Sequence, residues 1–253
     1  MGPCPLASSH PAIVLIDGNN FYASCEQALD PALLGKPVVV LSNNDGCVVS
    51  RSAEARHLGI PMGAPAFQLR NLLQRQAVVV RSSNYALYGD MSQRLMSSLE
   101  LWLAGLEVYS IDEAFGRLPR PRHGDLQGWG RELRARIHRD LGLPIAIGIA
   151  PSKVLAKLAN RIAKGEVEHA GVFDLGSSQD PANWLAGVAI EDVWGIGRKL
   201  SRWCRLRGVA TALQLRDMPS GELKAKAGVV GLRLQLELRG VSCLQLEECP
   251  AAK

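Results

Sequence analysis

Three acidic side chains stand at the ends of two apolar segments that are expected to be strands. Asp17 follows the apolar run 13–16, and Asp112 and Glu113 lie together within 108–115. Two carboxylates about 4 Å apart repel each other by roughly 4 kcal/mol at an effective dielectric constant of about 20. Such a cluster either raises a pKa or holds a cation, and neither segment contains a lysine. The pattern therefore favours a divalent metal site over the plainer alternative, in which acidic residues only cap strand ends.

A helix expected after Pro151 and Ser152 carries an apolar stripe and a basic stripe. Its basic residues fall three or four positions apart, which places them on one face. They are Lys153, Lys157, Arg161 and Lys164. Phosphate binding and a solvated amphipathic face explain the stripe equally well if the helix is taken alone. Because the helix follows a strand near the acidic cluster, at least one lysine is expected to act there.

The segment 192–200 has the apolar-Gly-apolar-Gly pattern of a helix-hairpin-helix turn. Gly195 and Gly197 would let backbone amides approach a phosphate closely. Five basic residues and no acidic one occur between positions 196 and 207. They are Arg198, Lys199, Arg202, Arg205 and Arg207. The pattern favours contact with a nucleic-acid backbone, independent of sequence, over a plain helical turn.

The composition is that of a globular protein with a sizeable core. The chain has 253 residues, of which 47% are hydrophobic, and a formal net charge of +5. One or two domains are expected, and the charge suits a polyanionic partner without requiring one. The six cysteines form no CxxC pair and no histidine lies at zinc-ligand spacing, so free thiols in a reducing cytoplasm are expected. The sequence shows neither an export signal nor a long apolar run, and no membrane association is expected.

Strands and helices alternate from the N-terminus to about Phe173. Strands are expected at 12–17, 37–41, 77–80 and 144–149, and helices at 52–58, 85–103 and 124–139. The alternation predicts an α/β or α+β core whose sheet ends carry the site. Beyond Phe173 the pattern changes to short helices and basic loops, which predicts a second, smaller module.

Five stretches taken together resemble the Y-family translesion DNA polymerases, in particular their UmuC-type catalytic subunits. The stretches are 21–26, 42–48, 109–115, 192–198 and 243–248. The resemblance implies an α+β, right-hand polymerase fold: a palm sheet, small fingers and a helical thumb that contains the helix-hairpin-helix turn. It further implies that the little-finger domain is absent and that the chain is C-terminally truncated.

The resemblance also implies boundaries along the chain. We expect an N-terminal extension with the first palm strand, fingers, palm, thumb and a truncated linker, at 1–21, 22–83, 84–173, 174–240 and 241–253. By similarity, Asp17, Asp112 and Glu113 would hold two Mg²⁺ ions, with the Gly18 carbonyl as a further ligand. Such a metal pair activates the primer 3′-hydroxyl and stabilises the leaving pyrophosphate.

Four further residues match nucleotide-binding positions of the family. Tyr22 falls at the steric gate, where an aromatic ring lies under the sugar and excludes a 2′-hydroxyl. Ser50, Arg56 and Lys164 fall on positions that contact the triphosphate, and their donor groups suit anions. Ala53 stands where some relatives carry an aromatic phosphate contact, which alanine cannot supply.

The resemblance implies a template-directed DNA polymerase that performs error-prone translesion synthesis in SOS DNA repair, with weak processivity because of the truncation. Its partners would be primer-template DNA, deoxynucleoside triphosphates, a processed UmuD-type subunit and RecA, whereas truncation would remove the usual sliding-clamp peptide. A different class of function is a catalytically silent DNA- or partner-binding remnant of a disrupted UmuC-type gene. A nucleotide cyclase with a two-metal palm would explain the carboxylates but leaves the helix-hairpin-helix turn unexplained.

Overall fold

A computed structural model describes residues 12–118, 125–165 and 167–247. The expected N-terminal extension 1–11, Cys4, Cys249 and the linker end 248–253 lie outside the described residues. The cysteines within the described ranges are free thiols: Cys25, Cys47, Cys204 and Cys243. No helix in the described part of the chain is both long and apolar enough to cross a lipid bilayer.

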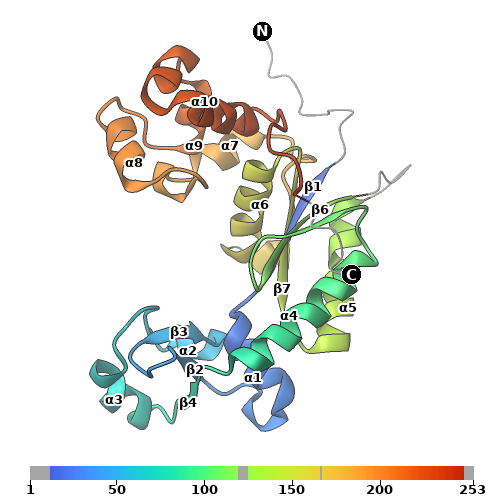
Figure 1. The fold of residues 1–253 in the computed structure, drawn as a ribbon, viewed down its shortest axis with the longest axis vertical. Coiled ribbons are helices and arrows are strands. Elements are labelled where there is room, and N and C mark those ends of the chain that lie inside the picture. Colours follow the sequence, from blue (N-terminus) through green and yellow to red (C-terminus); the bar gives the residue numbers. More distant parts are fainter. Residues whose placement is uncertain (1–11, 119–124, 166, 248–253) are drawn as a thin grey trace.

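A five-stranded sheet, the large sheet, forms the centre of the molecule (Figure 1). Its strands are β1 (Ile13–Gly18), β5 (Leu106–Val108), β6 (Glu113–Arg117), β7 (Ile145–Ala150) and β8 (Val172–Asp174), in the order β5-β6-β1-β7-β8. The middle strand β1 runs antiparallel to β6 and to β7, and β7 runs parallel to β8. All residues of β1 and β7 are buried, which explains why both segments are continuous apolar runs.

Helices cover both faces of the large sheet. The helices α4 (Tyr85–Glu100) and α5 (Leu126–Leu141) pack on one face, and α6 (Lys153–Gly165) packs on the other (Figure 1). Successive side chains of a strand point to opposite faces. Val14 and Ile16 therefore join the hydrophobic cluster of α4 and α5, whereas Ile13 and Leu15 join that of α6. By the same alternation, Asp17 lies on the face that α6 covers.

The approach of α6 to the sheet depends on Gly148 in β7. A Cβ atom at this position would lie 2.2 Å from the backbone nitrogen of Asn160 and 2.3 Å from the carbonyl oxygen of Ala156. The Asn160 side chain donates hydrogen bonds to the carbonyl oxygens of Ala146 (2.9 Å) and Leu15 (3.4 Å). Glycine and asparagine together hold α6 directly against β7 and β1.

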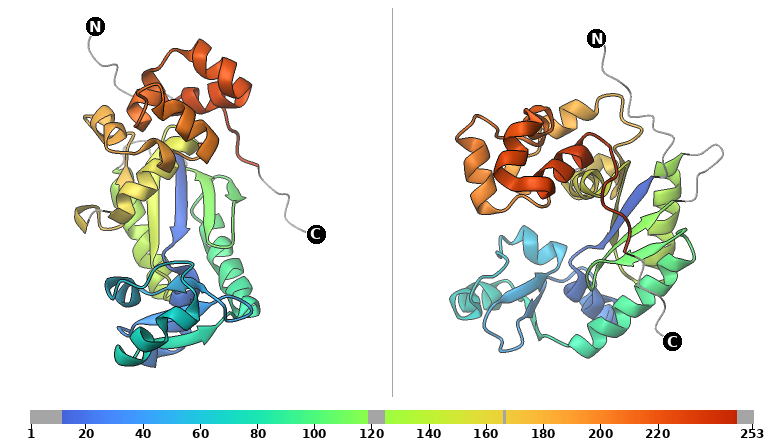
Figure 2. Two further views of the ribbon diagram at one scale, coloured as in Figure 1. Left: turned by 90° about the vertical axis from the view of Figure 1, so that its left-hand side faces the viewer. Right: turned by 45° about the horizontal axis from the view of Figure 1, so that its top comes forward.

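A second sheet belongs to the small-sheet region, residues 31–82, at one end of the molecule (Figure 2). Between α1 (Phe21–Leu29) and α4 the chain forms the 3₁₀ turn Pro31–Leu33, β2 (Val38–Leu41), β3 (Val48–Arg51), α2 (Ala53–His57), α3 (Ala66–Arg75) and β4 (Val79–Ser82). The strand order is β3-β2-β4. Val38 and Val40 of β2 lie in the same cluster as Val14 and Ile16 of the large sheet. Val39 and Leu41, on the other face, lie in a cluster confined to the small-sheet region.

Residues 181–238 form a helical region at the other end of the molecule. After the 3₁₀ turn Val167–His169 and β8, it contains α7 (Pro181–Ala186), the 3₁₀ turn Ile190–Asp192, α8 (Arg198–Arg205), α9 (Ala212–Asp217) and α10 (Ser220–Leu238). The expectation of short helices is confirmed for α7 to α9 and for the two helices that together make up the 19 residues of α10. Gly228, with φ 63° and ψ −153°, interrupts α10 in a conformation that glycine adopts readily. Two short helices therefore continue one another across this break.

The predicted α+β fold is observed. Figure 1 shows the small-sheet region and the helical region at opposite ends of the large sheet, both reaching out on the side where α6 lies. The chain is C-shaped in this view, with α6 along its inner side. Helix α6 therefore lies between the small-sheet region and the helical region.

Candidate active site

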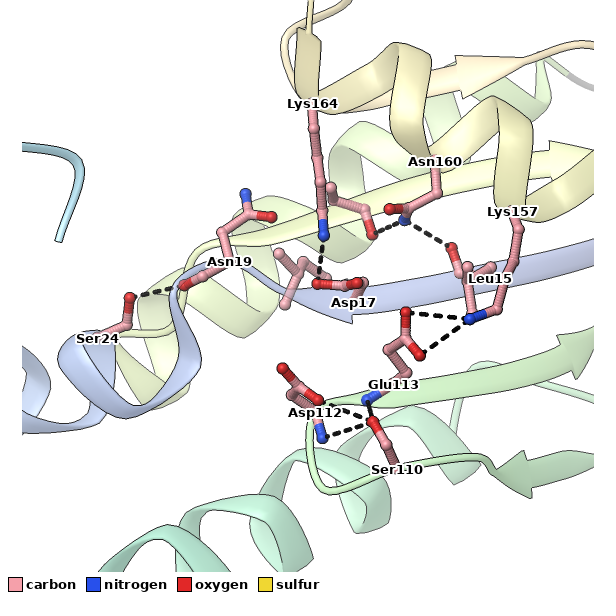
Figure 3. Close-up of polar contacts among 12 residues, drawn as sticks. Leu15, Asp17, Asn19, Ser24, Ser110, Asp112, Glu113, Lys157, Asn160 and Lys164 are labelled. Atoms are coloured by element: carbon pink, nitrogen blue, oxygen red, sulfur yellow. Dashed lines mark hydrogen bonds and ion pairs between the residues drawn. The ribbon is translucent and has the colours of Figure 1, made fainter. Parts of the chain in front are cut away.

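Asp17 and Glu113 face each other across the antiparallel pair of β1 and β6. Directly opposite residues in such a pair have Cβ atoms about 5 Å apart on the same face of the sheet. The neighbouring backbone is fixed too, because the Gly18 N–H donates to the carbonyl oxygen of Asp112 (2.8 Å). The structure thus brings the three predicted carboxylates to one end of the large sheet (Figure 3), and the hydrogen bond to Asp112 keeps Gly18 beside them.

Asp112 precedes β6 and takes a different direction from Glu113 (Figure 3). Its Oδ1 atom accepts a hydrogen bond from the Ser110 hydroxyl (2.8 Å). The Ser110 Oγ atom in turn accepts from the backbone N–H of Glu113 (3.1 Å). This short turn presents Asp112 to the pocket described below, while Glu113 points towards α6.

Two lysines of α6 neutralise the pair of carboxylates that face each other. Lys164 Nζ lies 2.6 Å from Asp17 Oδ1, and Lys157 Nζ lies 3.2 Å from Glu113 Oε2 and 3.4 Å from Oε1 (Figure 3). The strand segments themselves contain no lysine, so the cations come from a helix more than forty residues away in sequence. The expectation that at least one lysine of this helix acts near the carboxylates agrees with these contacts.

The basic stripe expected on α6 is only partly present. Lys153 is buried, and its Nζ atom donates to Glu107 Oε2 (2.5 Å) and to the carbonyl oxygen of Gln245 (2.8 Å). Arg161 is exposed and pairs with Asp192 (2.7 Å). The prediction of one solvated or phosphate-binding stripe is therefore wrong for Lys153, which serves an internal ion pair.

The electrostatics of Asp17 suit a bound cation. Burial raises the pKa of Asp17 from 3.8 to about 7; the ammonium of Lys164 opposes the rise and the nearby Glu113 carboxylate adds to it. Only 9% of the residue is exposed. An ionised carboxylate in this position needs a positive partner, and Lys164 supplies one.

The acidic residues match a hard divalent cation in donor chemistry. Carboxylate and carbonyl oxygens are the ligands that Mg²⁺ prefers. Within the described residues, no group of three or more Asp, Glu, His or Cys side chains is already arranged to hold a metal ion. Asp17 and Glu113 each form an ion pair with a lysine, and Asp112 accepts a hydrogen bond from Ser110. The donor set fits, and coordination requires these side chains to exchange their present partners.

A pocket of about 420 Å³ opens beside the carboxylates. The large sheet, α1, the small-sheet region and α6 all contribute to its wall. The lining residues are Asp17, Gly18, Asn20, Phe21, Tyr22, Val49, Ser50, Arg51, Arg56, Met62, Ile111, Asp112 and Lys164. All four predicted nucleotide-binding residues lie in this wall together with two of the three carboxylates. Glu113 is outside the wall.

Tyr22 is held as a rigid side of the pocket. Its ring stacks on Tyr88 with centroids 4.3 Å apart and an angle of 12° between the planes. The Tyr88 hydroxyl donates to Glu26 (2.8 Å), and Tyr85 meets the edge of the Tyr22 ring at 6.1 Å. Burial raises the pKa of Tyr22, so the phenol stays neutral and offers a flat, uncharged surface.

Ser50 has a structural task that the sequence did not reveal. Its hydroxyl oxygen accepts from the backbone N–H of Ala23 (3.1 Å) and its proton is donated to the carbonyl oxygen of Asn20 (3.1 Å). Asn20, with φ 53°, is the N-cap residue that precedes α1. Ser50 therefore ties β3 to the first turn of α1, and its predicted role as a triphosphate donor would require it to release Asn20.

The cationic part of the pocket contains the predicted Arg56 and also Arg51, which was not predicted from the sequence. Arg56 is exposed on α2 and, among the described residues, forms no ion pair. Arg51, at the end of β3, also lines the pocket. The signal that could have found Arg51 is its position directly after Ser50, because Val49, Ser50 and Arg51 all reach the pocket from one strand.

The predicted helix-hairpin-helix turn, which we call the Gly195 turn (residues 193–197), connects the 3₁₀ turn Ile190–Asp192 to α8. Gly195 has φ 92°, a conformation that favours glycine. Gly197 is exposed and precedes the first residue of α8. Val193 and Ile196 are buried beneath the turn, so its backbone is anchored from below while its glycines face outwards.

All five basic residues near this turn are exposed, and three of them form no ion pair within the described structure. Arg205 pairs with Glu191, and the Arg207 guanidinium lies over the Trp203 ring at 4.1 Å. The exposed residues that form no ion pair within the described structure are Arg198, Lys199 and Arg202. The structure groups these with Gly195 and Gly197 on the helical region, away from the pocket lining. The predicted site residues therefore form two separate groups.

Comparison with known proteins identifies relatives over most of the chain. Residues 16–161 match a family described as "IMS: impB/mucB/samB family". Protein UmuC of Salmonella typhimurium is 47% identical over 241 residues, which cover 94% of this chain and 57% of that protein. DNA polymerase IV of Bacillus velezensis is 33% identical over 230 residues, which cover 89% and 54%. This chain thus spans little more than half the length of these curated relatives.

Solved structures share the fold. A Y-family DNA polymerase chimera built from Dbh and Dpo4 matches with a TM-score of 0.77 and 25% sequence identity, covering 94% of this chain and 70% of that chain. DinB from Sulfolobus solfataricus matches with a TM-score of 0.72 and 25% identity, covering 94% and 69%. The large sheet, the small-sheet region and the helical region all fall within these matches.

Proposed function

The chain belongs to the impB/mucB/samB family, and from this premise we propose that it is a template-directed DNA polymerase. It would transfer a nucleotide from a deoxynucleoside triphosphate to the 3′-hydroxyl of a primer. The large sheet, the small-sheet region and the helical region would serve as palm, fingers and thumb. One observation carries the proposal: a single pocket combines carboxylates with a flat aromatic wall and cationic side chains.

Asp17, Asp112, Glu113 and the Gly18 carbonyl would hold two Mg²⁺ ions. When bound, such ions activate the attacking hydroxyl and stabilise charge on the leaving pyrophosphate. The contribution of the chain is to place Asp17 and Glu113 opposite each other on adjacent strands of a buried sheet, with Asp112 on the turn that leads into β6. Lys157 and Lys164 balance the charge of Asp17 and Glu113 in the present structure.

The walls of the pocket would bind the nucleotide. Arg56 and Lys164 supply donors for the triphosphate, and both reach the pocket from separate elements. The Tyr22 ring, braced by Tyr88, would lie under the sugar and leave no space for a 2′-hydroxyl. Specificity for deoxynucleotides would thus come from a rigid surface.

The helical region would hold the DNA. Backbone amides at Gly195 and Gly197, with Arg198, Lys199 and Arg202, suit contact with successive phosphates. We further propose error-prone translesion synthesis during SOS repair, with a UmuD-type subunit and RecA as partners. These finer roles rest on the family and on its named relatives.

Primer extension on undamaged and abasic templates tests the proposal. The wild-type chain at high concentration should add nucleotides only when Mg²⁺ is present. Asp112→Asn should reduce this rate by at least about a thousandfold, because a carboxylate that would hold the metal ions is removed. Its affinity for primer-template DNA, measured by fluorescence anisotropy, should stay unchanged.

A matched control is Asp90→Asn, which alters an exposed aspartate paired with Arg94 on α4. This variant should extend primers at the wild-type rate. DNA binding without any Mg²⁺-dependent extension by the wild-type chain would contradict the polymerase and favour the silent DNA-binding remnant.

A further inference from the structure

Lys157 lies between a carboxylate of the active site and the Gly195 turn. Its Nζ atom contacts both oxygens of Glu113, at 3.2 and 3.4 Å. The same ammonium lies 4.3 Å from the centre of the Tyr109 ring and 5.3 Å from that of Trp194. Its side chain is only 18% exposed. A cation over two aromatic faces and against one carboxylate has little freedom to move.

The two rings belong to different parts of the chain and are bound to each other. The Trp194 Nε1–H donates to the Tyr109 hydroxyl (3.2 Å), and the rings meet edge to face at 5.7 Å. Trp194 also contacts Phe115 of β6 at 5.9 Å. Trp194 directly precedes Gly195, so this cluster fastens the Gly195 turn to the strand that begins with Glu113.

Other charged groups nearby are committed elsewhere. Lys164 pairs with Asp17 and Lys153 with Glu107. Arg161, one helical turn beyond Lys157, pairs with Asp192. Within the described residues, Lys157 is therefore the basic side chain paired with Glu113, and Glu113 is its carboxylate partner.

We propose that Lys157 is a positioning residue that orients Glu113 and is itself kept in place by Trp194. The Gly195 turn and the readiness of Glu113 for a divalent cation are then coupled, although Trp194 and Glu113 form no ion pair or hydrogen bond. The inference rests on the proposed function in one respect, because it takes Glu113 as a metal ligand and the Gly195 turn as a DNA contact.

The direction of the coupling follows from charge. The ammonium of Lys157 and a divalent cation compete for the same carboxylate oxygens. Removing the ammonium should strengthen metal binding by the DNA-free chain, whereas a merely structural loss should weaken it. Turnover should fall in the same variant, because Glu113 is no longer oriented by the ammonium.

The probe is Mn²⁺ binding to the DNA-free chain, followed by the electron paramagnetic resonance signal of free Mn²⁺. Lys157→Met, which keeps the length of the side chain, should bind Mn²⁺ about fivefold more tightly. Lys157→Arg should return the affinity to within about twofold of wild type, because it keeps the charge and stacks on the same rings. Arg161→Met, on the same helix, should leave Mn²⁺ affinity unchanged.

Trp194→Leu tests the link to the Gly195 turn. Alone it should tighten Mn²⁺ binding about twofold, and added to Lys157→Met it should change nothing further, because both act through one ammonium. In primer extension, Lys157→Met should lower kcat about tenfold with little change in the KM for the nucleotide.

Unchanged or weaker Mn²⁺ binding by Lys157→Met would overturn the inference. So would an effect of Trp194→Leu that persists in the Lys157→Met background. If the Mn²⁺ pattern appears but no variant or wild-type chain extends primers, the coupling stands and the polymerase proposal fails. If extension is normal and the Mn²⁺ pattern is absent, the polymerase stands and the coupling fails.

Discussion

The carboxylate end of the large sheet and the Gly195 turn both concentrate charge, but they treat it in opposite ways. Asp17, Asp112 and Glu113 are partly or wholly buried, and each has a partner within the chain. Arg198, Lys199 and Arg202 are exposed and form no ion pair among the described residues. A buried charge must be compensated by a partner in the chain before any ligand binds, whereas an exposed charge is stabilised by water until a polyanion binds.

The difference indicates how each region would exchange partners. A cation that enters the sheet end must displace ammonium groups from Asp17 and Glu113. A phosphate that reaches the Gly195 turn displaces only water and counterions. Substitutions at the sheet end should therefore affect stability and pH dependence, and substitutions at the turn should affect salt dependence.

The largest expected effect is on folding and contrasts Gly148, in the large sheet beneath α6, with Gly197 of the Gly195 turn. Gly148→Ala should lower the free energy of unfolding by about 4 kcal/mol, because its Cβ would collide with the backbone of α6 at 2.2 Å. Gly197→Ala meets nothing within 4 Å and has φ −83°, so its cost should stay below about 1 kcal/mol. Urea unfolding measures both, and equal costs would contradict the contrast.

The next largest effect is the pH dependence of the free energy of unfolding, which is expected to arise at the carboxylate end of the large sheet. The pKa of Asp17 is raised from 3.8 to about 7 by burial, so between these values the folded state holds more protons than the unfolded state. The free energy of unfolding of the metal-free chain should therefore fall as the pH rises from about 4 to about 7, by roughly 3 kcal/mol. Asp17→Asn should flatten this slope in urea unfolding at several pH values.

The control for this slope is Asp140→Asn. Hydrogen bonds from Arg136 and Arg139 lower the pKa of this exposed aspartate, so its removal should not flatten the decline between pH 4 and 7. A slope that survives in Asp17→Asn would assign the dependence to another group.

The smallest effect, per residue, is expected at the Gly195 turn. Replacing Arg198, Lys199 and Arg202 by alanine should weaken DNA binding and lower the slope of log affinity against log salt by about one for every phosphate that the variant no longer neutralises. Fluorescence anisotropy at several salt concentrations measures this slope. Arg205→Ala is the matched control, because Arg205 is already paired with Glu191. An equal reduction of the slope in Arg205→Ala would contradict the expected difference between basic side chains with and without an ion pair.

Local patterns predicted the elements well. The strands expected at 12–17 and 144–149 are β1 (Ile13–Gly18) and β7 (Ile145–Ala150), and the helix expected at 124–139 is α5 (Leu126–Leu141). These elements could be predicted because apolar runs and helical spacing depend only on residues that are close together in the sequence. The break of α10 at Gly228 was missed, because a single glycine in a helical pattern does not reveal its backbone angles.

The residues of the site were predicted from the sequence, but the contacts among them were not. Tyr22, Ser50, Arg56 and Lys164 line one pocket with Asp17, yet their contacts could not be read from the sequence. The pairing of Lys157 with Glu113 joins residues 44 positions apart. It depends on the register of β1 with β6 and on the closeness of α6 to Gly148, and both are tertiary properties.

The shared core beneath β2 limits how the pocket beside the carboxylates can move. Val38 and Val40 pack into the core of the large sheet, while Val39 and Leu41 pack into the small-sheet region. A rotation of that region about a hinge would pull two valines out of a closed core, at a cost of about 1.5 kcal/mol or more for each. The pocket is therefore preformed. Under the proposed function, an incoming base pair would be selected by its fit to a fixed pocket, without the closure of a lid. Under that proposal, the enzyme would give up part of the discrimination that induced fit provides and would gain tolerance for templates of irregular shape.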